Sequence, residues 1–486
     1  MGRIVPCKRA GHSMLCPYDE NETGSENVFL RDTESDGYHC CVMKRALFKP
    51  GLIAAVAFGC VMVASSVASA QTLSVSPNPA MNDEPVAIHA TGLQPGERVT
   101  IQASLVDGAD EQWFAEAQFV ADAQGAIDTS TQAPVDGSYK EASGPGLIWS
   151  MRPADKHVAI YRAPRVWNPQ TIDFHLIRNG QQAANATLTQ TRIGAGVRQI
   201  RLQGELHGFL FLPAASTPRP GVLVVGGSEG GVPFDKAEWL ASHGYAALAL
   251  AYFRFEDLPQ DLEAIPLEYF GSALAWMMKR PEIQPDHIGV MGTSRGGELA
   301  LQLGSMYPEI KAVVAYVPAN VRYPACCGGT AVPYAWTWHG QPLAFAGTRD
   351  TPEPGGFINA EIPVENTNGP ILMIGAEDDG VWESSRMVDA AAGRLKRAHF
   401  SHPVVVLKYP HAGHRAGSPE ITPAWHGAVI HPVSRREMNF GGDAEGDARS
   451  SLDATPKVLD FLRTSLQAGS ATSAPAAAAP GAASTK

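Results

Sequence analysis

A serine stands between two glycines in the stretch Gly-Thr-Ser-Arg-Gly at residues 292–296, where an apolar run gives way to a helical pattern. The apolar run at residues 287–292 predicts a buried strand, and the pattern at residues 295–308 predicts a helix. A serine hydroxyl attacks a carbonyl carbon only when a base takes its proton and donors stabilise the oxyanion. A tight strand-to-helix turn serves both needs, because it exposes the hydroxyl and directs N–H groups of the helix N-terminus toward the reacting atoms. We therefore predict that Ser294 is a nucleophile; the alternative is a serine that only caps the helix.

Candidates for the base, and for the acid that orients it, follow two later apolar runs. His411 and His414 directly follow a valine-rich run, and Asp378 and Asp379 follow the apolar run before it. The order serine, aspartate, histidine, each after a strand, is that of the α/β-hydrolases. The aspartate would fix the tautomer of the histidine and stabilise its protonated form. Any one of these residues alone would be interpreted as a surface loop residue, but the set in this order predicts catalysis.

A glycine-rich turn at residues 226–231, Gly-Gly-Ser-Glu-Gly-Gly, follows an earlier apolar run. The oxyanion needs one N–H from the residue after the nucleophile and another from such a turn. We expect the first donor to be the backbone N–H of Arg295 and the second to lie near Ser228 or Glu229. A phosphate-binding loop is the rival interpretation of this turn, but the Gly-Lys-Ser/Thr ending of such loops is missing.

The elements that must position these residues alternate between strands and helices over residues 191–468. Near-continuous apolar strands separated by helices predict an α/β-hydrolase domain, with a mostly parallel sheet covered by helices on both faces. The predicted strands lie at 198–213 (two strands), 221–227, 245–252, 287–292, 310–318, 370–379 and 403–410. The predicted helices lie at 235–244, 266–281, 295–308, 384–398 and 451–466.

Residues 71–190 have a different pattern. Short runs alternate apolar and polar residues and are separated by turn groups such as Asn78-Pro79 and Pro95-Gly96. This pattern predicts a β-sandwich domain.

Residues 43–70 have the layout of a bacterial secretory signal peptide. A basic start leads into an apolar run, and Ala68-Ser69-Ala70 precedes Gln71 as a cleavage site. We predict a periplasmic or secreted protein without a stable membrane partner after cleavage. A membrane anchor is the alternative, since the apolar run is nearly long enough to span a bilayer.

The two ends of the chain lie outside the predicted domains. We interpret residues 1–42 as a mis-assigned extension upstream of the true start at Met43. The alternative is a cytoplasmic extension with a metal-binding Cys/His group, although the spacings of these cysteines and histidines match no zinc signature. Residues 469–486 are low in complexity and predict a disordered tail.

Charge and cysteine content narrow the class of protein. The formal net charge is −11 and there is no long basic block, which argues against a nucleic-acid partner. Only Cys326 and Cys327 lie beyond the signal, and because they are adjacent a mutual disulfide would be strained.

The sequence resembles the family of acyl-CoA thioesterases and bile-acid-CoA:amino-acid N-acyltransferases over most of residues 71–466. The resemblance rests on these stretches: VSPNPAMNDEPVAIHATGLQPGE, GPGLIWSMRP, HGYAALALAYF, GVMGTSRGGELAL, WTWHGQPL, EDDGVW, YPHAGH and FGGDAEGDARSSLDATPKVLDFL. It implies that the first domain is immunoglobulin-like and that the second is an α/β-hydrolase domain. It also implies that Ser294 is the nucleophile, His414 the base and Asp379 the acid, with Asp378 as the fallback.

The resemblance and the residues together predict an exported serine hydrolase that cleaves a small-molecule acyl thioester or ester without a metal or cofactor. The amino-acid-conjugating members carry cysteine at the nucleophile, and serine here favours transfer of the acyl group to water. The export signal also departs from the family, because acyl-CoA is cytosolic. The alternatives are an acyltransferase that passes the acyl group to an amine, and a catalytically inert two-domain binding protein.

Residues 321–369 form a long segment between two sheet strands that is rich in proline, glycine and aromatic residues. Long ordered loops of this kind often act as lids, so we predict a cap over the acyl group. The alternative is a surface insertion packed by its own aromatic side chains.

Overall fold

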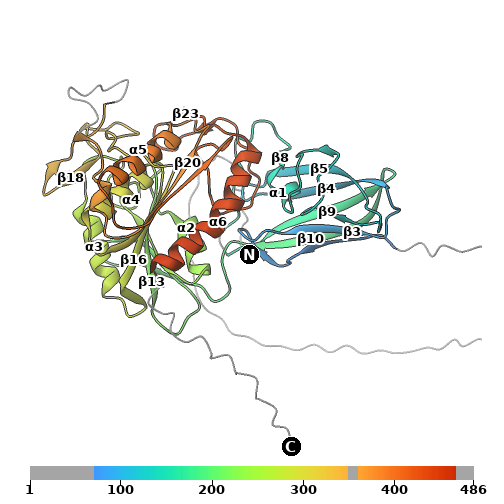
Figure 1. Ribbon diagram of the computed structural model, residues 1–486, viewed down its shortest axis with the longest axis horizontal. Coiled ribbons are helices and arrows are strands. Elements are labelled where there is room, and N and C mark those ends of the chain that lie inside the picture. Colours follow the sequence, from blue (N-terminus) through green and yellow to red (C-terminus); the bar gives the residue numbers. More distant parts are fainter. Residues whose placement is uncertain (1–69, 166, 348–358, 467–486) are drawn as a thin grey trace, which may run out of the picture. The chain divides into compact units, whose positions relative to one another are not determined.

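The computed structural model describes residues 70–165, 167–347 and 359–466 (Figure 1). The predicted extension, the predicted signal peptide up to residue 69 and the C-terminal tail lie outside these residues, as does the middle of the 321–369 segment. Among the helices that are described, none is both long and apolar enough to cross a membrane.

The first region, up to Thr191, consists of two β-sheets that share one hydrophobic core. The smaller sheet has the order β1 (Thr72–Ser76), β3 (Ala87–Thr91), β6 (Ile127–Asp128). The larger has the order β2 (Ala80–Met81), β10 (Gln181–Thr191), β9 (Gln170–Arg178), β4 (Arg98–Val106), β5 (Gln112–Val120), β7 (Asp136–Gly137), and β8 (Arg152–Pro153) also pairs with β5. A short helix, α1 (Gly146–Trp149), packs into the same core. Alternate residues of β4 and β5 are buried, as expected for strands with one face on a core.

The second region is built on an eight-stranded sheet of the α/β-hydrolase type, as predicted (Figure 1). Its order is β11 (Arg198–Arg201), β12 (His207–Leu212), β14 (Ala246–Ala251), β13 (Arg219–Val225), β16 (Ile283–Thr293), β17 (Ile310–Tyr316), β20 (Ile371–Ala376), β21 (Val404–Tyr409). The β11–β12 and β12–β14 pairs are antiparallel, and from β14 onward every pair is parallel. The parallel strands therefore end at one edge, where the predicted site residues follow them.

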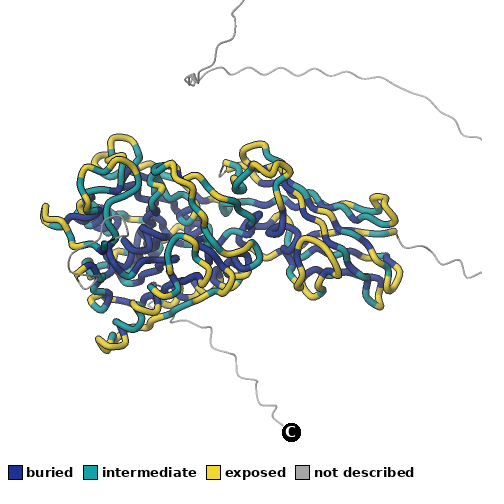
Figure 2. Tube along the Cα trace, turned by 90° about the horizontal axis from the view of Figure 1, so that it is seen from above, coloured by how far each residue is buried: buried dark blue, intermediate teal, exposed yellow. Residues whose placement is uncertain are grey.

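Helices cover both faces of this sheet. Helices α2 (Phe234–Ser242) and α6 (Ala444–Leu466) pack on one face, and α3 (Glu268–Met278), α4 (Arg295–Met306) and α5 (Ser384–Arg397) pack on the other. The central strands are buried on both sides, which explains why they are apolar without alternation (Figure 2). Helix α6 begins before the predicted residue 451 and continues through Pro456.

The 321–369 segment packs mainly on the hydrolase core. Its β18 (Trp336–Trp338) pairs with β15 (Ile265–Pro266) and β19 (Gln341–Pro342), and η2 (Val364–Asn366) follows later. Trp336 is buried beside Tyr252, with ring centroids 5.9 Å apart, and its indole N–H donates to Glu298 Oε1 at 2.7 Å. The aromatic side chain of Trp336 thus contributes to the core. Cys326 and Cys327 within the segment are joined in a disulfide, which the sequence analysis did not expect.

The two regions lie within one compact unit and contact each other through helix α2 and the chain after β21. Trp239 Nε1 of α2 donates to Asp83 Oδ2 at 2.8 Å, and Gln190 Nε2 donates to the carbonyl oxygen of Ile421 at 3.2 Å.

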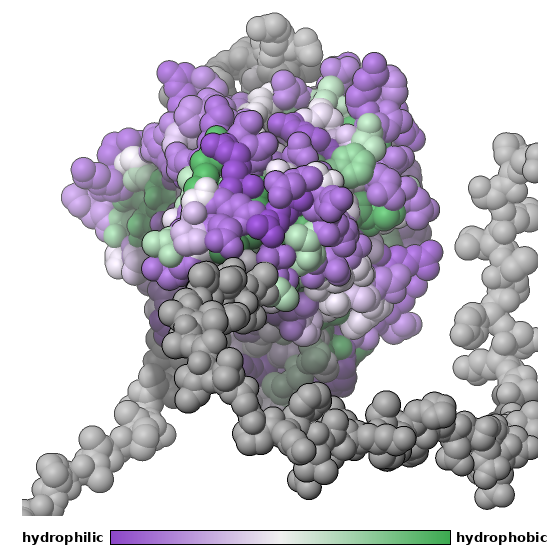
Figure 3. All heavy atoms as spheres, turned by 90° about the vertical axis from the view of Figure 1, so that its right-hand side faces the viewer, coloured by the Kyte–Doolittle hydropathy of each residue, from purple (hydrophilic) through white to green (hydrophobic). Residues whose placement is uncertain are grey.

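The surface in Figure 3 is mainly hydrophilic, and its hydrophobic residues form small separate patches.

Candidate active site

Ser294 occupies a sharp turn between β16 and α4, with φ 60° and ψ −122°. The turn is possible because its flanking glycines pack directly against backbone. A Cβ at Gly292 would lie 2.0 Å from the carbonyl oxygen of Gly296, and a Cβ at Gly296 would lie 2.4 Å from that of Gly226. The N–H of Ser294 donates to the carbonyl oxygen of Tyr316 at 2.9 Å, which ties the turn to the end of β17. Glycine is therefore required at both positions because a side chain would not fit, and not because the backbone needs additional conformational freedom.

The hydroxyl of Ser294 lies next to the ring of His414, which in turn lies next to Asp379. The distance from Ser294 Oγ to His414 Nε2 is 2.8 Å, and His414 Nδ1 is 2.9 and 2.8 Å from the two carboxylate oxygens of Asp379. Because an ionised carboxylate only accepts hydrogen bonds, Nδ1 carries the proton and Nε2 offers its lone pair to the serine hydroxyl. The structure thus brings together the three residues that the sequence singled out, in an order and polarity suited to general-base catalysis.

Asp379 is held as a hydrogen-bond acceptor by its own loop. Its Oδ1 accepts from the backbone N–H groups of Val381 at 2.9 Å and Trp382 at 3.2 Å, and its side chain is 0% exposed. The fallback residue Asp378 points elsewhere: its side chain is 54% exposed and lies 3.4 Å from Nδ1 of His411. The geometry therefore separates two aspartates that the sequence leaves adjacent.

Aromatic rings confine the imidazole of His414. Phe440 stacks on it at a centroid distance of 6.4 Å, and Trp382 meets it edge-on at 5.3 Å. Trp382 is in turn stacked on Tyr323 at 5.3 Å. Phe440 could not be predicted as a site residue from the sequence, because residues 415–443 have no regular pattern.

The glycine-rich turn packs beside Ser294. Ser228 and Glu229 line the same pocket as Ser294 and His414, and Glu229 Oε1 accepts from the N–H of Gly227 at 3.1 Å. Within the described residues, the backbone N–H groups of Ser228 and Glu229 have no acceptor. The N–H of Arg295, at the first position of α4, likewise lacks a partner inside the helix. These are the donors that the sequence predicts for an oxyanion.

The pocket at Ser294 has a volume of about 420 Å³. Its walls combine the glycine-rich turn and start of α2, the nucleophile turn, Ile160 of the first region and the chain after β21. Two cationic side chains, Lys236 and Arg415, also line it, and neither was singled out from the sequence. No described residue of the 321–369 segment lines this pocket, so the cap over the acyl group stays a prediction.

His431 is a second histidine at this pocket, and no pattern in the sequence marks it as a site residue. It follows the short strand β22 (Val429–Ile430), which pairs with β23 (Glu437–Met438). Its Nε2 is 3.1 Å from Ser228 Oγ. Burial and the positive charge of Arg254 lower the pKa of His431 below its usual value.

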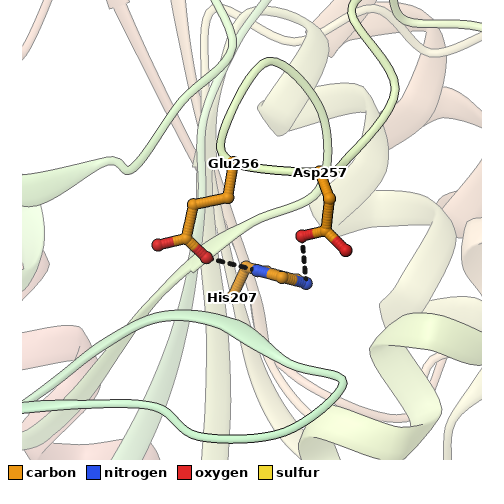
Figure 4. Close-up of side chains that lie close together, drawn as sticks. All are labelled: His207, Glu256 and Asp257. Atoms are coloured by element: carbon orange, nitrogen blue, oxygen red, sulfur yellow. Dashed lines mark hydrogen bonds and ion pairs between the residues drawn. The ribbon is translucent and has the colours of Figure 1, made fainter.

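Another cluster has the composition of a metal site but lies apart from this pocket. Among the described residues, the side chains of His207, Glu256 and Asp257 bring one ligand atom each within 4.8 Å of one another (Figure 4). Glu256 is also paired with Arg201, and Asp257 is 84% exposed. We assign no metal to this cluster, because ion pairs account for its geometry.

Comparison with family models matches both regions of the chain. Residues 83–204 match the acyl-CoA thioester hydrolase/BAAT N-terminal region, and residues 265–326 and 345–468 match the BAAT/acyl-CoA thioester hydrolase C-terminal region.

Curated relatives cover most of the chain. Acyl-coenzyme A thioesterase 6 of Mus musculus is 31% identical over 415 residues, which cover 81% of this chain and 96% of the relative. Peroxisomal succinyl-coenzyme A thioesterase of Mus musculus is 30% identical, with the same two coverages. Acyl-coenzyme A amino acid N-acyltransferase 1 of Mus musculus is 32% identical over 420 residues, which cover 82% of this chain and 99% of the relative.

A solved structure of a dienelactone hydrolase-like promiscuous phosphotriesterase from metagenomic libraries is also similar. The identity is 17% and the TM-score 0.35, and the match covers 55% of this chain and 98% of that one.

Proposed function

The chain belongs to the acyl-CoA thioester hydrolase/BAAT family, and from this premise we propose that it cleaves an acyl thioester, or a carboxylic ester, through an acyl-serine intermediate. Membership of the family supports an enzyme of the hydrolase class. The observation that carries the mechanism is the pair of contacts on His414, which joins Ser294 on one side and Asp379 on the other.

In the first half of the reaction His414 acts as the base. As Ser294 Oγ attacks the carbonyl carbon, its proton passes to Nε2 of His414, and the carbonyl π electrons move onto oxygen. Asp379 stabilises the resulting imidazolium through Nδ1–H. The N–H of Arg295 and an N–H of Ser228 or Glu229 donate to the oxyanion, each in a fixed position before the reaction begins.

In the second half His414 acts as acid and then as base again. The tetrahedral species collapses by expelling the thiolate or alkoxide, which takes the proton from Nε2. Water then enters, gives a proton to His414 and attacks the acyl-serine carbonyl. A second collapse returns the proton to Ser294 and releases the carboxylic acid.

Serine at the nucleophile position favours hydrolysis over transfer to an amine. An acyl-serine is an oxygen ester, whereas the amino-acid-conjugating members form a thioester on cysteine that an amine attacks more readily. Transfer of the acyl group to an amine remains the second candidate, because the similarity to the N-acyltransferase covers nearly all of that relative. An inert binding protein fits less well, since every member of the proposed set is present and in contact.

The proposal extends to the first region and to the location of the protein. We propose that the two-sheet region is an immunoglobulin-like domain that supports the pocket through Ile160. We also propose export, because residues 43–70 have the layout of a signal peptide.

Expression in a Gram-negative bacterium should then yield a periplasmic chain whose N-terminal sequence begins at Gln71. A cytoplasmic chain that keeps residues 43–70 would contradict export.

Replacing Ser294 by alanine should abolish turnover of every accepted substrate. We expect the wild type to hydrolyse members of a panel of acyl-CoAs and p-nitrophenyl esters, and Ser294→Ala to lower kcat by about 10⁴-fold or more. A serine-directed fluorophosphonate probe should label the wild type but not the variant. Adding glycine or taurine to the assay tests the second candidate, which predicts an N-acyl product. Equal labelling and turnover of both proteins would contradict the role of Ser294.

The two neighbouring aspartates should differ sharply when each is changed to asparagine. Asp379→Asn should lower kcat by about 10⁴-fold with little change in KM, because the amide no longer favours the tautomer that leaves Nε2 free to accept. Asp378→Asn is the matched control and should stay within a few-fold of the wild type, since its side chain is exposed and does not contact His414. Steady-state kinetics beside a thermal melt of each variant would decide; a larger loss in Asp378→Asn would show that the acid is misassigned.

A further inference from the structure

The hydroxyl of Ser228 and the ring of His431 form a contact at the pocket that the mechanism above does not use. Ser228 Oγ and His431 Nε2 are 3.1 Å apart, and both residues line the pocket together with Ser294 and His414. His431 is 5% exposed and comes from the β22–β23 hairpin, some 200 residues after Ser228. A long-range, buried contact of this kind raises the question of which group donates.

The backbone around His431 fixes its tautomer. The Nδ1 atom of His431 accepts hydrogen bonds from the N–H groups of Val433 at 3.2 Å and Ser434 at 3.0 Å. A ring nitrogen that receives N–H donors must present its lone pair, so the single proton of the neutral ring lies on Nε2. The lowered pKa keeps this ring neutral near pH 7. The positive charge of Arg254, whose Nη1 donates to the carbonyl oxygen of Glu229 at 3.1 Å, disfavours a second proton on the ring. The charged side chains of Glu229, Asp235, Lys236 and Arg415 line the same pocket.

The tautomer sets the direction of the Ser228 hydroxyl. Because Nε2 carries a proton, it donates to Ser228 Oγ, and the serine oxygen is the acceptor. Its own hydrogen must then point away from the ring. Within the part of the chain that the structure describes, the Ser228 hydroxyl makes no other hydrogen bond, so this hydrogen is free to face a ligand in the pocket. The same polarity excludes His431 as a base that would activate Ser228 as a second nucleophile.

Ser228 also stands where a donor to the reacting carbonyl is useful. Its turn packs on the nucleophile turn, since a Cβ at Gly227 would lie 3.2 Å from the carbonyl oxygen of Thr293, next to Ser294. The backbone N–H groups of Ser228 and Glu229, in the same turn, have no acceptor among the described residues. A hydroxyl that accepts from an imidazole N–H is polarised, which makes its own hydrogen a better donor.

We propose that the Ser228 hydroxyl is a side-chain donor to the carbonyl oxygen of the substrate and to the oxyanion, and that His431 is a positioning residue that holds the hydroxyl in the donating direction. The inference rests on the proposed acyl-serine mechanism. No proton is transferred in this contact: Ser228 keeps its hydrogen while the carbonyl π electrons move onto oxygen, and the bond weakens again when the leaving group departs. The contact is strongest in the transition state, so its effect falls on kcat more than on KM.

The test compares Ser228→Ala and Ser228→Thr with the wild-type chain on butyryl-CoA and p-nitrophenyl butyrate. We expect Ser228→Ala to lower kcat by about 100-fold with KM within a few-fold, as for the loss of one oxyanion donor. Ser228→Thr keeps the hydroxyl and should restore most of the rate. Ser401→Ala, an exposed serine outside the pocket, is the control for loss of a hydroxyl as such. A wild-type kcat in Ser228→Ala would overturn the proposal.

A double-mutant cycle separates the positioning role of His431 from a structural one. His431→Phe should lower kcat by about 10-fold when Ser228 is present and have no further effect in the Ser228→Ala background, because its action passes through that hydroxyl. The same loss in both backgrounds would overturn the positioning role, and thermal melts of all four proteins would identify a folding defect. Absence of turnover by the wild type on both substrates would instead overturn the proposed function and, with it, this inference.

Discussion

Direct backbone contact around the nucleophile turn is the constraint on which the rest of the site depends. Gly292 and Gly296 have no room for a side chain, because the turn is pressed against itself and against the glycine-rich turn after β13. This packing holds Ser294 at a positive φ that non-glycine residues rarely adopt, and such strain persists only where the surroundings enforce it. It also packs the nucleophile turn against the glycine-rich turn, whose Ser228 and Glu229 N–H groups have no acceptor among the described residues. A single close contact therefore fixes the Ser294 turn and the glycine-rich turn relative to each other.

The chain after β21 also lines the pocket at Ser294. This part of the chain carries His414, whose backbone N–H donates to the carbonyl oxygen of Phe440 at 2.7 Å. It continues through the β22–β23 hairpin, which brings His431 to Ser228. The first region contacts this part of the chain directly, since the backbone N–H of Gly427 donates to the carbonyl oxygen of Ala159 at 2.7 Å. The two-sheet region is thus part of the architecture of the pocket rather than an appendage.

The sequence predicts the α/β sheet, the strand–turn–helix at Ser294 and the serine, aspartate and histidine that meet there, because each depends on local patterns. The local pattern does not distinguish Asp378 from Asp379 as the acid, and only the family resemblance favours Asp379. The direction of each side chain depends on contacts within the folded loop, such as the two backbone N–H groups that hold Asp379. The sequence misses His431 and Phe440, which lie in an irregular segment whose position depends on tertiary contacts. The burial of Trp336 in the core also could not be predicted from the aromatic content of residues 321–369, and the cap over the acyl group stays a prediction.

The proposed mechanism requires that Ser294 carries the acyl group during turnover. The most direct measurement is mass spectrometry of the intact protein and its peptides after mixing with an acyl-CoA and quenching in acid within the first turnover. We expect a mass increase equal to that of the acyl group less the one hydrogen it replaces, located on the peptide that contains Ser294 and absent from the alanine variant. Turnover without any acylated species, or acylation at another residue that persists in that variant, would contradict it.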